Sequence, residues 1–190
     1  MTARRRFDQR ALARAVLSFW FDEHGFAAWF TRDDAFDIAI RRRFGAAHEA
    51  AWAGALDAMR ADADGALALI IILDQFSRNL FRNDARAFAA DQKARGLARN
   101  ALSRRFDMIA TPARRAFFYM PFMHSENLAD QDFCVALFKA RLAGSASVPY
   151  AEEHRAIIRR FGRFPHRNKA LGRTSTREEI AYLAAGGFNP

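Results

Sequence analysis

The chain has 190 residues, of which 51% are hydrophobic and 27% charged, so it is long and apolar enough to fold and is not expected to be disordered. Its formal net charge is +9, and its one cysteine, Cys134, excludes an internal disulfide and any multi-cysteine metal site. We expect a single α-helical domain over residues 1–190 in a reducing compartment, the cytoplasm.

Apolar side chains recur three or four residues apart along almost the whole chain, as on one face of a helix. Five helix starts carry capping signals: Asp33 with Asp34, Asn83 or Asp84, Thr111 before a proline, Ser147 with Pro149, and Thr176 with Glu179. The predicted helices cover residues 11–21, 33–44, 65–80, 83–105, 111–120, 124–144, 147–161 and 176–185.

The helix over residues 65–80 is apolar nearly all round in its first half, so we expect it at the centre of the core. Its apolar run, Ala66 to Leu73, has eight residues, fewer than the roughly 20 that span a membrane. The N-terminal segment is basic and amphipathic, unlike a secretory signal. With β-branched residues sparse, we expect an all-α fold of antiparallel helical pairs, about seven or eight helices, and no membrane partner.

A first polar group follows this apolar run, in the stretch LDQFSRN. Asp74 and Arg78 stand four residues apart, as do Gln75 and Asn79, so the two pairs lie on adjacent helical stripes. Polar side chains that continue a buried helix must be paired. They form either a network between helices with an Asp74–Arg78 salt bridge, or the wall of a ligand site.

A second group lies in FFYMPFMHSENLADQD. On a continuous helix His124 and Asn127 share one stripe, whereas Glu126 lies on another, so a simple helical metal motif is not expected. A general acid or base role for His124 or Glu126 requires that the surrounding aromatic residues exclude water. Cys134 lies between apolar residues and is predicted to be a core residue rather than a nucleophile.

A third group lies between Glu153 and Glu178, where eight Arg or Lys residues occur without an acid. The helix before it places His154 on the same face as its apolar residues, so His154 is expected to face inward. Two interpretations stay open. The cations could pair with the acidic stretch HSENLADQD, or they could converge on an anion. The residues predicted for the anion site are Arg163, His166, Arg167 and Asn168.

Several classes of protein are disfavoured by what the sequence lacks. It has no glycine-rich phosphate loop, nucleophile elbow or dinucleotide fingerprint. Its basic residues are not interleaved with exposed-looking aromatic residues, so nucleic acid is not an expected partner. No metal and no cofactor is predicted.

Five ordered motifs, VLSFWF, LIIILDQFSRNLFR, ARAFAADQKA, FFYMPFMHSENLADQ and HRAIIRRFGRFPHRNKALGRTSTREEIAYL, resemble the bacterial domain-of-unknown-function family 924. The resemblance covers about Ala15 to Leu183. It implies an all-α, tetratricopeptide-like fold, arranged as a right-handed helical array, and no assigned activity. The family pattern commonly has proline at Ser77 and glutamate at Met123, so a mechanism that needs a carboxylate beside His124 at that position is in doubt here.

Two classes of function remain. In the first, a polar pocket binds a small anionic ligand with Asp74, Arg78, Asn79 and the basic segment, and His124, Glu126 and His154 supply acid/base chemistry. In the second, the chain is a tetratricopeptide-like module whose groove binds a protein or an acidic peptide without catalysis. The mixture of ionisable groups favours the first.

Overall fold

The computed structural model describes residues 7–29 and 31–190, and over these ranges the chain is helical without a strand. The first residues of the basic N-terminal segment, 1–6, lie outside the described residues. No helix within the described ranges has the length and apolar character needed to cross a membrane.

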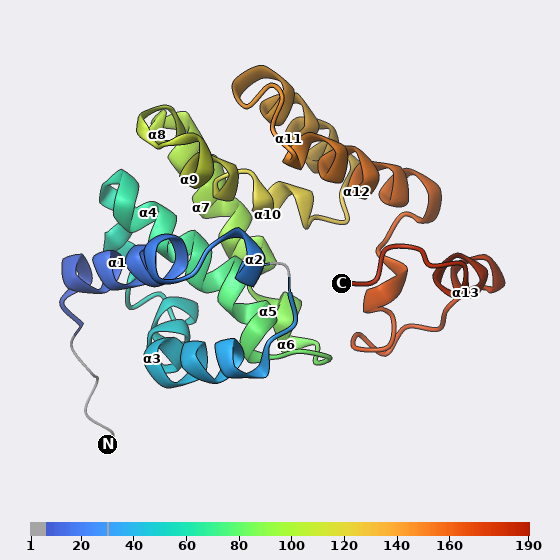
Figure 1. The fold of residues 1–190 in the computed structure, drawn as a ribbon, viewed down its shortest axis with the longest axis horizontal. Coiled ribbons are helices and arrows are strands. Elements are labelled where there is room, and N and C mark those ends of the chain that lie inside the picture. Colours follow the sequence, from blue (N-terminus) through green and yellow to red (C-terminus); the bar gives the residue numbers. More distant parts are fainter. Residues whose placement is uncertain (1–6, 30) are drawn as a thin grey trace.

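The helical elements follow one another with short connections (Figure 1). The α-helices are α1 (Gln9–Leu17), α2 (Phe26–Trp29), α3 (Asp34–Trp52), α4 (Ala63–Ile70), α5 (Ser77–Leu80), α6 (Arg86–Ala89), α7 (Asp91–Ser103), α8 (Phe106–Ile109), α9 (Pro112–Phe117), α10 (Met120–Met123), α11 (Leu128–Arg141), α12 (Ser147–Phe161) and α13 (Arg177–Ala184). Two π-helical turns, η1 (Ser18–Glu23) and η3 (Ile71–Phe76), and two 3₁₀ turns, η2 (Asp57–Ala61) and η4 (Pro165–Arg167), join them.

The central helix consists of α4, η3 and α5 and runs through the middle of the molecule (Figure 1). Every residue from Gly65 to Ser77 is buried, which confirms the central position predicted from its composition. α1, α3 and α7 pack around it. α7 contacts α4 through Ala94, Ala98 and Ala101, and these small side chains let the two helix axes approach closely.

Two of the predicted capping signals are confirmed as hydrogen-bonded caps. Asp33 accepts hydrogen bonds from Ala35 N at 2.8 Å and Phe36 N at 3.3 Å, and Thr176 with Glu179 forms a reciprocal capping box at α13. These side chains satisfy backbone N–H groups that have no partner inside the helix. Thr111 stands at the N-cap of α9 but its side chain makes no capping hydrogen bond, Asp84 accepts from Arg86 N at the start of α6, and the N-cap of α12 is Ala146 rather than Ser147.

Two predicted helices are shorter than expected. The helix predicted over residues 83–105 is divided into α6 and α7, and Asn83 has a left-handed backbone with φ 61°. The helix predicted over residues 124–144 begins only at Leu128, because the Asn127 side chain accepts the first amide hydrogens of α11. His124 instead ends α10, so His124 and Asn127 do not share a helical stripe.

Pro121 also lies in a different position from the one predicted. The sequence places it at the end of a helix, whereas in the structure it occupies the first turn of α10. The break comes at Phe118 and Tyr119, before the proline. A first-turn proline is tolerated because its missing N–H would have no helical partner there.

The end of α12 and the segment that follows it pack apart from the main core, to which α11 and the first half of α12 contribute. α11 and α12 are joined by residues 142–146 and lie along one another (Figure 1). After Gly162, whose φ of 69° ends α12, a small apolar cluster forms around Ile157, Ile158 and Phe164 and is distinct from the main core. The all-helical prediction is thus confirmed, and the tetratricopeptide-like array stays a prediction.

Replacing Gly65 with alanine is expected to lower the free energy of unfolding by about 1–3 kcal/mol, the usual cost of overpacking. A Cβ atom at Gly65 would lie 2.1 Å from the carbonyl oxygen of Met59, which is backbone and cannot rotate away. The matched control is Gly96→Ala in α7, where a Cβ meets nothing within 4 Å. The control is expected to gain about 0.5–1 kcal/mol from helix propensity. Urea unfolding of both variants tests this, and equal effects would contradict it.

Candidate functional site

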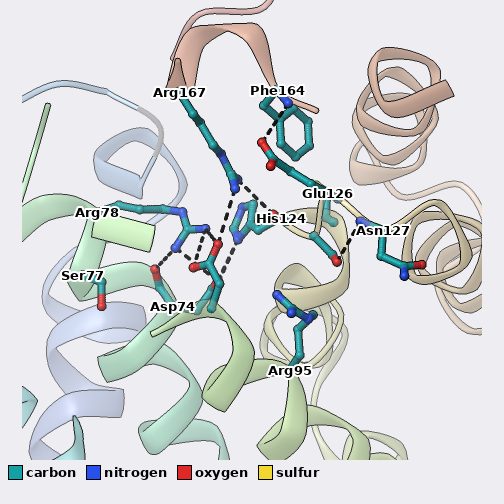
Figure 2. Close-up of polar contacts among 12 residues, drawn as sticks. Asp74, Ser77, Arg78, Arg95, His124, Glu126, Asn127, Phe164 and Arg167 are labelled. Atoms are coloured by element: carbon teal, nitrogen blue, oxygen red, sulfur yellow. Dashed lines mark hydrogen bonds and ion pairs between the residues drawn. The ribbon is translucent and has the colours of Figure 1, made fainter. Parts of the chain in front are cut away.

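Side chains from four segments, namely the central helix, α7, the chain after α10 and η4, converge on one polar cluster, shown in Figure 2. The cluster consists of Asp74 on η3, Arg78 on α5, Asp91 at the start of α7, His124 after α10 and Arg167 in η4. The π-helical turn carries Asp74 at the point where the central helix passes α10. Such turns occur frequently at functional sites.

The first part of the cluster is a carboxylate–imidazole pair. Asp74 is fully buried, and both of its carboxylate oxygens lie 2.9 Å from His124 Nδ1. Gln75 Nε2 donates a further hydrogen bond to Asp74 at 2.6 Å. Burial would raise the pKa of Asp74, but the contacts with His124 and Arg78 hold it below its ordinary value. Asp74 is therefore an ionised carboxylate that accepts a hydrogen bond from His124 Nδ1–H.

His124 is the base of this pair. Burial and the charge of Arg78 lower the pKa of His124, against the opposing effect of Asp74. A neutral imidazole that donates Nδ1–H to Asp74 carries a free lone pair on Nε2. The His124 side chain is 15% exposed, so solvent reaches the edge of the cluster.

Two arginines share one buried carboxylate in the second part of the cluster. Arg78 lies 3.3 Å from Asp74 and donates to both oxygens of Asp91 at 3.1 and 3.3 Å. Arg167 reaches the same Asp91 at 3.5 Å and donates to the backbone oxygen of His124 at 3.0 Å. The Asp74–Arg78 pair predicted from the sequence is present, and Asp91 extends it to the C-terminal segment.

Arg167 is buried with an incomplete set of partners. Its guanidinium lies over the rings of Phe88 and Phe164, 4.6 and 4.5 Å from their centroids. Its Nε has no hydrogen-bond partner among the described residues. Burial and the charge of Arg78 lower the pKa of Arg167 to about 10, so it stays charged at neutral pH. A buried donor without an acceptor costs about 1–3 kcal/mol, which an oxygen of a ligand or a water would offset.

Two further histidines lie beside the cluster. The His154 ring centroid is 6.4 Å from that of His124, and its Nδ1 donates to the Tyr150 carbonyl oxygen at 2.7 Å, which leaves its Nε2 free. Burial, followed by the nearby His124 and Arg167, lowers the pKa of His154 to about 3. Burial and the charge of Arg167 lower the pKa of His166 to about 3 as well. Both imidazoles are neutral at neutral pH.

Four of the predicted site residues have partners outside the cluster. Glu126 accepts from Arg173 at 2.8 and 3.0 Å and from Phe164 N at 2.9 Å, so it holds the basic segment in place. Arg163 binds Glu179 at 2.6 and 2.8 Å, and Asn168 binds the same carboxylate at 3.2 Å. Asn79 donates to Asp37 at 2.7 Å. These four are structural contacts in the described chain.

The basic segment is thus paired with carboxylates along most of its length. Arg160 contacts Glu178 at 2.9 Å, in addition to the pairs that Arg163, Arg167 and Arg173 make. Within the acidic stretch, Asp132 bridges two cations of α12, Arg155 and Arg159, at 3.4 and 3.1 Å. Most charges of the segment therefore pair with carboxylates, and Arg167 enters the polar cluster through Asp91. The anion site stays a prediction.

No side chain of the cluster is placed to act as a nucleophile. Within the described residues, the hydrogen bonds of the His124 side chain all go to Asp74. Ser77 Oγ donates to Leu73 O at 2.6 Å and contacts His48 at 2.8 Å instead. Cys134 is buried, and burial raises the pKa of its thiol, as expected for a core residue.

Two cavities of the structure lie away from the cluster. One, of about 480 Å³, lies between Asp62, Asp64, Ile109 and Arg114, and another, of about 300 Å³, lies between Arg160 and Glu178. In the ranges 7–29 and 31–190, no group of three or more His, Cys, Asp or Glu side chains has the geometry to hold a metal ion.

The sequence reasoning missed three residues that shape the site: Asp91, Phe164 and Phe188. Asp91 lay inside the helix predicted over residues 83–105, and its partners are 13 and 76 residues away. Phe164 lies in the basic segment. The signal available for it was an aromatic residue among histidines, and in the structure its ring contacts His154 and His166. Phe188 gave no signal, because it follows the last predicted helix.

The fold and the site define a class: an all-helical protein with a buried cluster of two carboxylates and two arginines that orients a neutral histidine. The chain belongs to the family described as bacterial protein of unknown function (DUF924), whose profile matches residues 16–187. This confirms the resemblance seen in the sequence. The solved structure of a protein of unknown function from Agrobacterium tumefaciens is similar, with a TM-score of 0.90 and 43% identity, over 94% of this chain and 100% of that chain. No curated protein matches the chain.

Proposed function

We propose that this chain binds a small anionic ligand beside the polar cluster and that His124 acts on it as a general base. The observation that carries the proposal is the contact of His124 Nδ1 with the buried Asp74 carboxylate, 2.9 Å from both oxygens. This contact fixes the ring and its tautomer, so that Nε2 is the proton acceptor. A structural salt bridge would not require a neutral imidazole.

The chemistry proposed is proton removal from the ligand or from a water molecule. Neither Ser77 nor Cys134 is available to His124, so the nucleophile is not a side chain of the cluster. The lowered pKa of His124 keeps the base unprotonated at neutral pH, which is the form that accepts a proton.

The anionic character of the ligand rests on a buried donor that has no acceptor. Arg167 Nε is buried without a partner among the described residues, and His166 Nδ1, which donates in its Nδ1–H tautomer, has none there either. The charges of Arg78 and Arg167 are balanced by Asp74 and Asp91, so the ligand is held by hydrogen bonds to these donors more than by excess positive charge. A carboxylate or phosphate oxygen fits such donors.

Inorganic phosphate and acetate are expected to bind the wild-type chain at millimolar concentration, measured by isothermal titration calorimetry. Arg167→Gln is expected to weaken binding about 10- to 100-fold, because a hydrogen bond to a charged group contributes about 1.5–3 kcal/mol. The matched control is Arg160→Gln, an arginine of the same segment that pairs with the exposed Glu178 and should bind like wild type.

A measurement on the wild-type chain keeps the proposal testable if the buried Arg167 variant does not fold. Long-range ¹H–¹⁵N NMR at neutral pH should show His124 protonated at Nδ1 and unprotonated at Nε2. A doubly protonated His124, or the absence of phosphate and acetate binding to the wild type, would refute the proposed function.

A further inference from the structure

The segment after α13 turns back toward the polar cluster. We call residues 186–188 the strap. In Figure 1 the chain after α13 returns past η4 and ends between the C-terminal helices and the central helix. The strap places the Phe188 ring 4.4 Å from the His154 ring centroid and 5.3 Å from that of His166.

The rings around Phe188 form an aromatic seat, made of His154, Phe164 and His166. The Phe164 ring centroid is 5.5 Å from that of His154 and 5.6 Å from that of His166, so Phe164 contacts both histidine rings. His154 packs on Phe188 edge to face, at an interplanar angle of 62°. These distances and angles are those of favourable aromatic pairs. The seat thus holds one aromatic ring against His154, whose ring centroid is 6.4 Å from that of His124.

The two histidines of the seat also carry polar atoms. His154 Nδ1 donates to the Tyr150 carbonyl oxygen, and His166 Nδ1 is buried without a partner among the described residues. Arg167, whose Nε also has none there, stacks on the Phe164 ring of the seat. A phenylalanine side chain satisfies none of these polar atoms, whereas a ring with an anionic substituent would contact both the seat and the donors.

Hydrogen bonds from backbone amides hold the strap. Gly186 N donates to Leu183 O at 3.1 Å, Gly187 N donates to Tyr182 O at 3.0 Å, and Phe188 N donates to Tyr182 Oη at 2.9 Å. Gly186 has φ 81°, a conformation that favours glycine. Phe188 packs on the small cluster of Ile157, Ile158 and Phe164 and not on the main core, so its release leaves the main core intact.

We propose that the seat is the binding site for the aromatic ring of a small aryl anion, and that Phe188 occupies it until the strap opens. This inference rests on the proposed function, since the anion of the ligand faces the donors of the polar cluster. It also accounts for the position of the cavities, because the space beside His154 and His166 is filled by the chain's own ring.

Removing the Phe188 ring is expected to strengthen the binding of benzoate at least tenfold, measured by calorimetry with Phe188→Ala. A site that its own side chain occupies binds a competitor with an affinity reduced by the fraction of open molecules. Acetate, which lacks the ring, should bind both chains equally. Tyr182→Phe removes only the strap's Oη contact and should give a smaller gain, about 2- to 10-fold, the usual effect of one hydrogen bond.

The matched control is Phe133→Ala, which removes an exposed phenylalanine on α11 and should leave benzoate binding unchanged. Thermal unfolding followed by circular dichroism verifies that each variant is folded. In the wild type, the ring-proton NMR signals of His154 and His166 carry the ring-current shift of Phe188, and they should move in Phe188→Ala. Equal benzoate affinities in wild type and Phe188→Ala, or an equal gain for acetate, would overturn the proposal.

Neutral benzyl alcohol separates this inference from the proposed function. A gain for benzyl alcohol in Phe188→Ala without phosphate binding to either chain would support the seat and refute the anionic ligand. Phosphate binding as proposed, with no gain for benzyl alcohol or benzoate, would refute the seat and leave the polar cluster as the ligand site.

Discussion

Replacing Asp91 with alanine is expected to lower the free energy of unfolding by about 3–5 kcal/mol, as for other buried ion pairs from which one partner is removed. Asp91 is the carboxylate between Arg78 and Arg167, at 3.1 and 3.5 Å. Without it, Arg167 has no carboxylate partner and lies beside another buried guanidinium. Urea unfolding, with the midpoint and slope compared with those of wild type, measures the change.

Asp132→Ala is the matched control for this prediction. Asp132 also bridges two arginines, Arg155 and Arg159, but its side chain is 47% exposed. Water screens exposed pairs, so this substitution is expected to change the free energy of unfolding by less than about 1 kcal/mol. Equal losses for the two variants would show that burial does not determine how much the Asp91 ion pairs contribute to the free energy of unfolding.

Lowering the pH from about 7 to about 4 is expected to destabilise the fold through His154 and His166, by on the order of 3 kcal/mol for each. In the unfolded chain both histidines take up a proton near their ordinary pKa of 6.5, whereas in the folded chain the pKa of each is about 3. Between these values the unfolded state binds more protons than the folded state. Stability is therefore present above pH 6.5 and is lost as the pH falls toward 3.

His154→Phe isolates one of these contributions, because it keeps an aromatic ring between Phe164 and Phe188 and removes the titrating group. The loss of stability between the two pH values should shrink by on the order of 3 kcal/mol relative to wild type. Denaturant unfolding at each pH measures it, and carboxylates contribute equally to both chains. If both chains lose the same stability, His154 is not neutral in the folded state.

Much of the fold could be predicted because the signals were local. Helical periodicity and capping residues such as Asp33 and Thr176 act within a few residues of where they stand. The interruptions at Ala90 and Tyr119 were missed, because a break between two helices or before a proline is determined by packing against the rest of the fold.

The candidate site was predicted in part, and the reason is again one of distance along the chain. The Asp74–Arg78 pair lies within one helical turn, so its spacing revealed it. The contact of Asp74 with His124 spans 50 residues, and helical spacing says nothing about such a contact. Glu126 carries the right chemistry for a catalytic group, but its neighbour Arg173 engages it as a structural carboxylate.

The π-helical turn η3 has a consequence for how this site could change. A regular helix advances about 100° per residue, so the loss of one residue from η3 would rotate everything after it by that angle. Arg78 follows η3 and would turn away from Asp91, whereas the apolar α4 before it would keep its contacts. The number of residues in η3 therefore determines whether Arg78 faces Asp74 and Asp91. A change in the length of a loop elsewhere does not alter this helical register.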